Sequence, residues 1–146
     1  MTPTEIGLIR SSWASVVPIA DTAASLFYAR LFELDPAIER LFRRTDMDAQ
    51  RKNLMQTLAV VVKSLDTLDQ IVPAVQALGR RHAGYGVRES HYATVGEALL
   101  WTLEQGLGEG FTPDVRAAWA TAYGTLATVM IEAARADTET AVEAAA

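Results

Sequence analysis

The sequence contains no cysteine and only two histidines among its 146 residues. Without cysteine the chain cannot form disulfides, thiolate zinc sites or iron–sulfur clusters. The absence of cysteine also fits a reducing compartment. The N-terminus, Met1 to Glu5, has neither a basic region nor a long apolar stretch, so no signal peptide is expected. Together these absences predict a cytoplasmic protein.

Positive charge and long apolar runs are also scarce. The 13 lysines and arginines are outnumbered by 18 acidic residues, which gives a formal net charge of -5. A chain of that charge is not suited to neutralising phosphates, so no nucleic-acid partner is expected. The longest apolar runs, such as residues 58–62, are far too short to cross a membrane. What the chain does have is apolar content: 50% of its residues are hydrophobic, enough for the core of one domain.

Apolar residues recur at helical spacing along most of the chain, and no segment shows sustained strand alternation. Helices are expected at residues 2–17, 21–34, 36–42, 49–64, 68–83, 91–107 and 112–132. Pro73 is expected to divide the 68–83 helix, and Ser90 to cap the helix that follows. The sequence therefore predicts an all-α fold of about six to eight helices, with a domain over residues 1–132. Residues 133–146, rich in alanine and glutamate, are expected to extend the last helix or fray without adding to the core.

Both histidines lie in one short stretch, residues 78–92. His82 falls near the end of an apolar helical segment, one turn after Leu78, and Gly84 and Gly86 then end the helix. A single imidazole is rarely enough to define a site. Taken alone, His82 fits a polar residue near a helix end.

Several short motifs lie along the chain in a set order. They are Leu26-Phe27-Tyr28, Asp35-Pro36 before Leu41-Phe42, Gln50 four residues before Leu54, Leu78 to His82, His91 to Glu97, and Ala118-Trp119 with Ala122-Tyr123-Gly124. Each motif is weak alone. Together, in this order and spacing, they resemble the globins, and most closely bacterial single-domain haemoglobins and the haem domain of flavohaemoglobins.

The resemblance implies a globin fold enclosing a non-covalent haem b (iron protoporphyrin IX) between the helix of Gln50 and that of His82. It makes His82 the proximal iron ligand, in agreement with the use of neutral imidazole as an axial haem ligand. The iron would stay pentacoordinate, because no histidine stands at position 50. Tyr28 and Gln50 would lie on the distal side, where a hydroxyl and an amide can each donate a hydrogen bond to a bound ligand. The other haem contacts that the resemblance implies are Phe42, Leu54, Leu78, Val87, Tyr92 and Val95.

The distal residues also have ordinary structural roles. Phe42 and Leu54 fit a plain hydrophobic core. A buried Tyr28 can bond to a backbone carbonyl, and Gln50, near a helix start, can swing out to water.

On the proximal side the match to flavohaemoglobins is incomplete. That family pairs the proximal histidine with a tyrosine and a glutamate, a network that makes the imidazole more anionic. Tyr92 matches the tyrosine, but the glutamate position falls on Ala134. Glu132 lies two residues earlier, on another face of the helix, and is expected to point to solvent. The N–H of His82 is therefore expected to reach the backbone carbonyl of Leu78, which argues against peroxidase-like chemistry.

Two functions fit this pocket, and the residues leave open whether the protein is an enzyme. The first is reversible binding of dioxygen for storage, transport or scavenging, with nitric oxide and sulfide as further ligands. The second is nitric oxide dioxygenation, which yields nitrate and would need a separate reductase, because no flavin or nicotinamide domain follows in the sequence. A haem-free globin acting as a sensor or interaction module is a third class, against which His82 and Phe42 argue.

Overall fold

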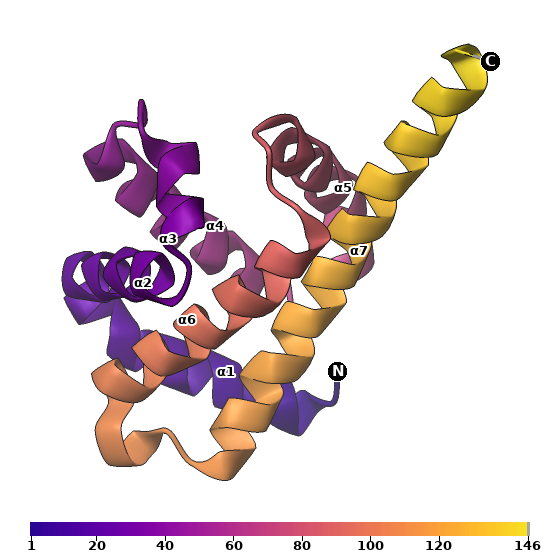
Figure 1. Ribbon diagram of the computed structural model, residues 1–146. Helices are drawn as coiled ribbons and strands as arrows, with labels where there is room; N and C mark the ends of the chain where they lie inside the picture. Colours follow the sequence, from indigo (N-terminus) through magenta and orange to yellow (C-terminus); the bar gives the residue numbers. More distant parts are fainter. Residues whose placement is uncertain (146) are drawn as a thin grey trace.

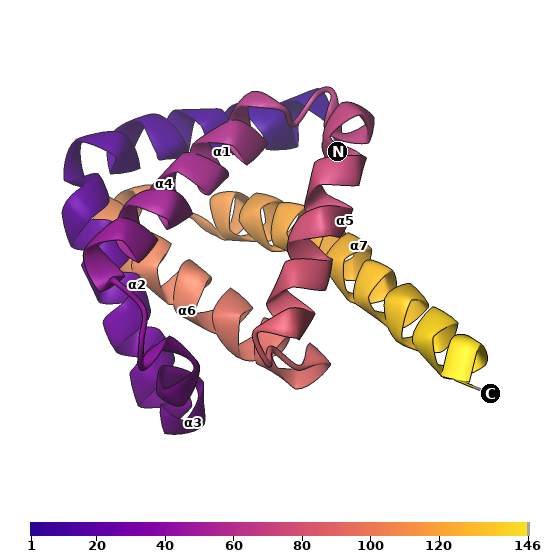
Figure 2. The ribbon, with the colours of Figure 1, turned by 90° about the horizontal axis from the view of Figure 1, so that it is seen from above.

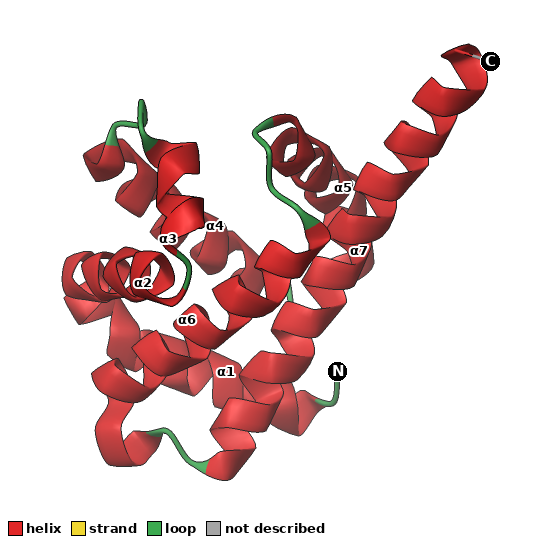
Figure 3. Cartoon of the chain, in the orientation of Figure 1, coloured by secondary structure: helices red, strands yellow, loops and turns green. Residues whose placement is uncertain are grey.

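A computed structural model describes residues 1–145 and the side chains of residues 1–137. Within that range the chain forms seven α-helices and three short 3-10 turns, and no strand is present (Figure 3). The elements are α1 Pro3–Val16, η1 Val17–Ile19, α2 Ala20–Leu34, α3 Pro36–Glu39, η2 Arg40–Phe42, α4 Met47–Lys63, α5 Leu68–Gly84, α6 Glu89–Leu107, η3 Gly108–Gly110 and α7 Pro113–Ala145. The all-α prediction is confirmed.

Side-chain caps set where several helices begin. At α1, the Thr2 hydroxyl accepts from the Glu5 N–H at 3.1 Å, and the Glu5 carboxylate accepts from the Thr2 N–H at 3.0 Å. This reciprocal pair is a capping box, and it fits the helix start predicted near residue 2. At α4, the Asp46 carboxylate accepts from the backbone N–H groups of Asp48 and Ala49. The helix therefore begins at Met47, two residues before the predicted start.

Two expectations about helix boundaries are wrong. Pro73 does not divide the helix that carries His82, because α5 is continuous from Leu68 to Gly84. Pro73 can donate no hydrogen bond to the carbonyl of Asp69, but both residues are exposed, so water can satisfy that carbonyl. Ser90 does not cap α6. The helix begins at Glu89, and the His91 ring accepts a hydrogen bond from the Arg88 N–H at 3.0 Å through Nδ1.

The helices pack as crossed pairs around the core (Figure 1). α5 crosses α7, and α2 crosses α6; these are the two most extensive helix contacts. α4 packs on α1 and α2 instead, and diverges from α5 beyond the short connection at residues 64–67 (Figure 2). The helices expected to carry Gln50 and His82 therefore form two separate walls of the fold.

α5 and α7 meet at backbone level at Gly79. A Cβ added to this glycine would lie 2.5 Å from the carbonyl oxygen of Met130 and 2.6 Å from its Cα. Only a hydrogen atom fits there, because neither backbone atom can rotate away. His82 follows three residues later on α5, so this contact fixes the helix of His82 against α7.

A buried side-chain hydrogen bond joins the first and last helices, α1 and α7. Trp119 on α7 donates from Nε1 to the Ser12 hydroxyl at 2.9 Å, and Ser12 donates in turn to the backbone of its own helix α1. Ser12 is thereby satisfied within the core, as buried polar groups normally are.

The last helix extends through residues 133–145, which is one of the two alternatives expected for this region. α7 runs without interruption to Ala145, and Ala133 is buried, so the expectation that this region adds no core is wrong at that position. Arg135 pairs with Glu89 at the start of α6, and Arg80 lies 3.5 Å from Asp137. Residue 146 lies outside the described residues. None of the described helices combines the length and apolar content needed to cross a bilayer.

Candidate functional site

His82 lies in the last turn of α5 with one ring nitrogen already engaged. Its Nδ1 is 2.8 Å from the carbonyl oxygen of Leu78, one turn earlier. A carbonyl can only accept, so Nδ1 carries the hydrogen and Nε2 carries the lone pair. The predicted bond to Leu78 is confirmed. Within the described residues Nε2 makes no hydrogen bond, which leaves its lone pair available to a metal.

The surroundings of His82 keep its ring neutral. Burial lowers the pKa of His82 below its ordinary value, the hydrogen bond to Leu78 acts in the opposite direction, and the nearby Arg81 lowers the pKa further. A neutral imidazole is the form that ligates metals. In the part of the chain that the structure describes, no three His, Asp or Glu side chains gather as a metal-binding group. His82 is thus a single candidate ligand.

Tyr28 on α2 and Gln50 on α4 are joined directly. The Gln50 Nε2 amide donates to the Tyr28 hydroxyl at 3.0 Å. Tyr28 is buried, with 5% of its surface exposed. Its hydroxyl bonds to Gln50 and not to a backbone carbonyl, and Gln50 points at Tyr28 and not out to water. Because the hydroxyl oxygen accepts this bond, the phenolic hydrogen remains free to donate to another group. Burial raises the pKa of Tyr28, against smaller opposite effects of Gln50 and Arg51, so the phenol stays protonated.

Phe42 lies against the same group of aromatic rings. Its ring centroid is 5.6 Å from that of Tyr28 and 5.4 Å from that of Phe32. Phe42 is only half-buried, so one part of the ring is not covered by protein. The Phe27 ring also lies edge-on to Tyr28, at 5.0 Å, so Tyr28 is held by two aromatic contacts.

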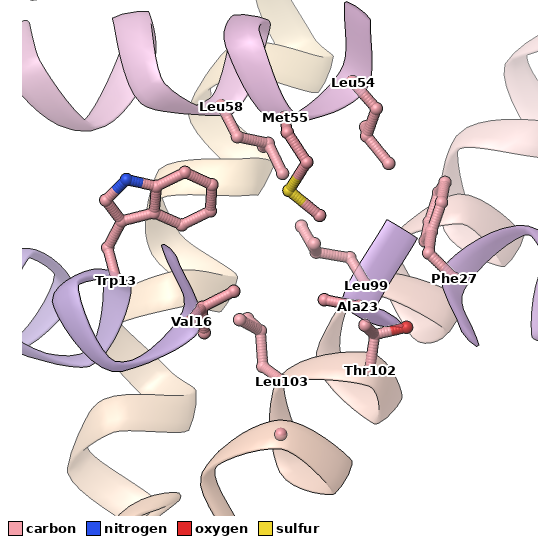
Figure 4. A pocket seen from close by; sticks show the side chains of 11 residues that line it. Trp13, Val16, Ala23, Phe27, Leu54, Met55, Leu58, Leu99, Thr102 and Leu103 are labelled. Atoms are coloured by element: carbon pink, nitrogen blue, oxygen red, sulfur yellow. The ribbon is translucent and has the colours of Figure 1, made fainter. Parts of the chain in front are cut away.

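A small apolar cavity lies in the core between four helices. It has a volume of about 10 Å³ and is closed by side chains from α1, α2, α4 and α6 (Figure 4). Leu54, one turn after Gln50, and Phe27, next to Tyr28, both line it. A space so small and apolar stays dry.

The other wall is built from α5, α6 and α7. Tyr123 on α7 donates from its hydroxyl to the backbone carbonyl of Tyr92 at 2.6 Å, and its ring lies against Gly96. Burial, with Tyr92 nearby, holds the pKa of Tyr123 well above its ordinary range. Burial also raises the pKa of Tyr92, which is half-buried like Val95. The sequence marked Tyr123 as a family motif but gave no sign of this bond, because the partner is a backbone atom on another helix.

Glu132 is exposed, as expected, and Ala134 is half-buried. The exposure of Glu132 fits the expectation that it points to solvent, and a proximal role for it stays untested.

The two walls approach each other at the mouth of the site. After α5, the backbone turns at Gly86, whose φ of +93° suits glycine. A Cβ at this position would lie 3.3 Å from Leu41 Cδ2, so the segment of Phe42 touches the segment of His82. Val87 follows, half-buried, and its N–H donates to the carbonyl of His82 at 3.0 Å.

Comparisons with known proteins match this arrangement. A family model described as Globin matches residues 25–130. The chain is 31% identical to a flavohemoprotein of Bacillus subtilis over 86% of this chain and 32% of that protein. It is 34% identical to a neuroglobin of Danio rerio over 85% of this chain and 86% of that protein. The chain therefore spans about a third of the length of the flavohemoprotein that it matches.

Solved structures share the fold. A bacterial globin from Campylobacter jejuni has a TM-score of 0.82 over 94% of this chain and 99% of that chain, at 23% sequence identity. A hexacoordinated heme protein from an anhydrobiotic tardigrade has a TM-score of 0.80 over 92% of this chain and 96% of that chain, at 17% identity. The expected globin fold is confirmed, and with the match over residues 25–130 and the neuroglobin relative it shows that this chain belongs to the globin family.

Proposed function

We propose that this globin holds a b-type haem non-covalently, with His82 as the proximal ligand, and binds dioxygen reversibly on the side of Tyr28 and Gln50. The observation that carries the proposal is the state of His82: a neutral ring, oriented by Leu78, whose Nε2 lone pair is free. One imidazole suffices for a metal whose other in-plane ligands come from a macrocycle. The printed names of relatives, flavohemoprotein and heme protein, support the same cofactor.

The residues between the two walls fit a flat apolar group. Phe42, Leu54, Leu78, Val87, Tyr92 and Val95 are all only half-buried, although their side chains are largely apolar. Half-buried apolar side chains on facing walls gain free energy when a macrocycle covers them, roughly 25 cal/mol for each Å² removed from water. These residues would hold the haem by contact, and His82 would hold it by coordination.

When bound, haem iron supplies an open coordination position for a diatomic ligand. The protein supplies the hydrogen bonds. Tyr28 has a phenolic hydrogen with no acceptor among the described residues, and Gln50 fixes the hydroxyl by donating to its oxygen. A hydrogen bond to a charged or strongly polar acceptor is worth about 1.5–3 kcal/mol, which corresponds to roughly a tenfold to hundredfold change in ligand retention.

Nitric oxide dioxygenation is a second use of the same pocket, favoured by the similarity to flavohemoproteins. In that use, a bound haem would supply the redox chemistry that turns dioxygen and nitric oxide into nitrate, and a reductase would supply one electron for each turnover. Sulfide is a further candidate ligand of the ferric state.

An absorption spectrum of the purified, haem-reconstituted protein tests the proposal directly. We expect a Soret band in the natural protein and loss of stable haem retention in His82→Ala. His91→Ala is the matched control, because His91 is the other histidine and serves as a cap of α6. Equal haem retention in all three proteins would show that His82 is not the ligand.

A further inference from the structure

Positive charge is concentrated in two short segments of this acidic chain. Residues 40–52 and 80–88 together hold eight of the 13 lysines and arginines but two of the 18 acidic residues. The two segments therefore carry a formal charge of +6, whereas the remainder of the chain carries -11. The cations are Arg40, Arg43, Arg44, Arg51, Lys52, Arg80, Arg81 and Arg88.

The fold brings these two segments to one end of the molecule. The connection between η2 and α4 and the connection between α5 and α6 lie at the same end in both views (Figures 1 and 2). Leu41 of the first segment is in contact with Gly86 of the second. The positive charges thus lie on two neighbouring segments beside the proposed haem site, since Phe42 and His82 belong to the same segments.

Most of these cations have no partner in the part of the chain that the structure describes. Eight lysines and arginines make no ion pair there, and six of the eight lie in the two segments. We call these six the basic rim: Arg40, Arg43, Arg44, Lys52, Arg81 and Arg88. All six are exposed. Even with the two propionate carboxylates of a bound haem counted, the formal charge of the two segments stays at +4.

An exposed aromatic side chain lies within this surface. Tyr85, between the two glycines that follow His82, is 68% exposed. Tyrosine and arginine are enriched at the centres of protein interfaces. The rim therefore combines the charge that steers a partner with a side chain that can anchor it.

We propose that the basic rim is the docking face for an acidic flavoprotein that reduces the haem iron. This inference rests on the proposed function, because only a haem protein needs such a donor. The transfer moves one electron from the reduced flavin to ferric iron, leaving ferrous iron and a flavin oxidised by one electron. An acidic donor is repelled by most of the surface and attracted at the rim, so electrostatic steering would bring it to the site.

Charge reversal with a matched control tests this assignment. Arg43→Glu/Arg88→Glu changes one rim residue in each segment. Lys63→Glu/Arg116→Glu changes the total charge equally, at two exposed cations that lie outside the rim and make no ion pair among the described residues. The donor is the reduced form of an acidic flavodoxin, mixed with each ferric, haem-loaded protein in a stopped-flow instrument. Binding of flavodoxin to each haem-free protein is measured separately by backbone amide NMR.

We expect the natural protein to be reduced more slowly as salt is added. At low ionic strength the rim variant should be at least tenfold slower and lose its salt dependence, while the control stays within about twofold of the natural protein. Reduction by the methyl viologen cation radical should instead become faster in the rim variant. Amide shifts on adding flavodoxin should fall in residues 40–52 and 80–88.

Several outcomes would overturn the proposal. Equal slowing in both double variants would mean that only total charge matters. Shifts confined to other surfaces would place the partner elsewhere, and binding to phosphatidylserine vesicles without flavodoxin binding would identify a lipid surface instead. A missing Soret band would remove the proposed function as well, whereas a haem-loaded protein with salt-independent reduction would remove this inference alone.

Discussion

At the scale of single residues, the direction of one hydrogen bond decides what Tyr28 can do. The amide of Gln50 can only donate through Nε2, so the phenol oxygen is the acceptor and its hydrogen stays free. Burial keeps the phenol protonated by raising its pKa. Tyr28 is therefore the stronger of the two candidates for donating to a ligand.

Replacing this tyrosine should weaken ligand retention. We expect Tyr28→Phe to release dioxygen at least several-fold faster, because the phenylalanine keeps the ring packing but removes the donor. Stopped-flow displacement of dioxygen by carbon monoxide measures the rate. Tyr85→Phe is the control, since Tyr85 is largely exposed and lies outside the pocket. An unchanged rate in Tyr28→Phe would mean that the phenol does not face the ligand.

Sequence reasoning at this scale succeeded where geometry is local. The bond from His82 to Leu78 joins residues one helical turn apart, so helix geometry alone makes it available. The bond between Gln50 and Tyr28 joins residues 22 positions apart and depends on how α2 and α4 pack. No sequence pattern showed which of the two would accept.

At the scale of elements, α5, the helix of His82, packs against α7 at Gly79, where the two backbones are in direct contact. Gly79→Ala should place a methyl group into the backbone of Met130. We expect a loss of about 1–3 kcal/mol in the free energy of unfolding, because overpacking forces the two helices apart. Urea denaturation measures it.

Gly124→Ala is the control on α7, and we expect it to change stability in the opposite direction. A Cβ there meets nothing within 4 Å, so alanine should stabilise the helix by about 0.5–1 kcal/mol. If both variants changed stability in the same direction, the backbone contact at Gly79 would not be the cause.

The contact of Tyr123 on α7 with Tyr92 on α6 should make the stability of the fold depend on pH in alkaline solution. Tyr123 keeps its proton in the folded protein well above its ordinary pKa, whereas the unfolded chain releases it near pH 10. The stability that this creates is full below pH 10 and is lost as the pH rises above it.

Tyr123→Phe should therefore cost about 0.5–1.5 kcal/mol at pH 8, through loss of the bond to Tyr92. The difference from the natural protein should shrink at pH 11. Denaturation curves at both values test this. A difference that grew with pH would contradict the assigned sign.

Helix boundaries show what the sequence could and could not predict about elements. α1 ends at the 3-10 turn Val17–Ile19, which contains Pro18, close to the boundary at residue 17 that the sequence predicts. Pro73 does not break α5, because it lies in an early, exposed turn of the helix. The loss of one backbone hydrogen bond costs little stability there. Asp46 was overlooked as a cap, although aspartate before an apolar periodic run is a known start signal.

For the whole molecule, the motifs predicted a globin because their order reflects which helices must face each other. The charge pattern around the site was visible in the sequence only as scattered arginines. The contact between Leu41 and Gly86, which unites them, depends on the complete fold.

Removing the haem should therefore weaken the protein unevenly. The half-buried apolar side chains on α4, α5 and α6 would face water, while α1 and α7 keep their bridge between Ser12 and Trp119. At a haem concentration 1,000 times the dissociation constant, the stability gained is about 4 kcal/mol. We expect a lower melting temperature for the haem-free protein, with faster hydrogen exchange at residues 40–54 and 78–95 than in α1. Identical melting and exchange with and without haem would mean that the two walls do not close on a ligand, whereas a change confined to these segments would locate the ligand between them.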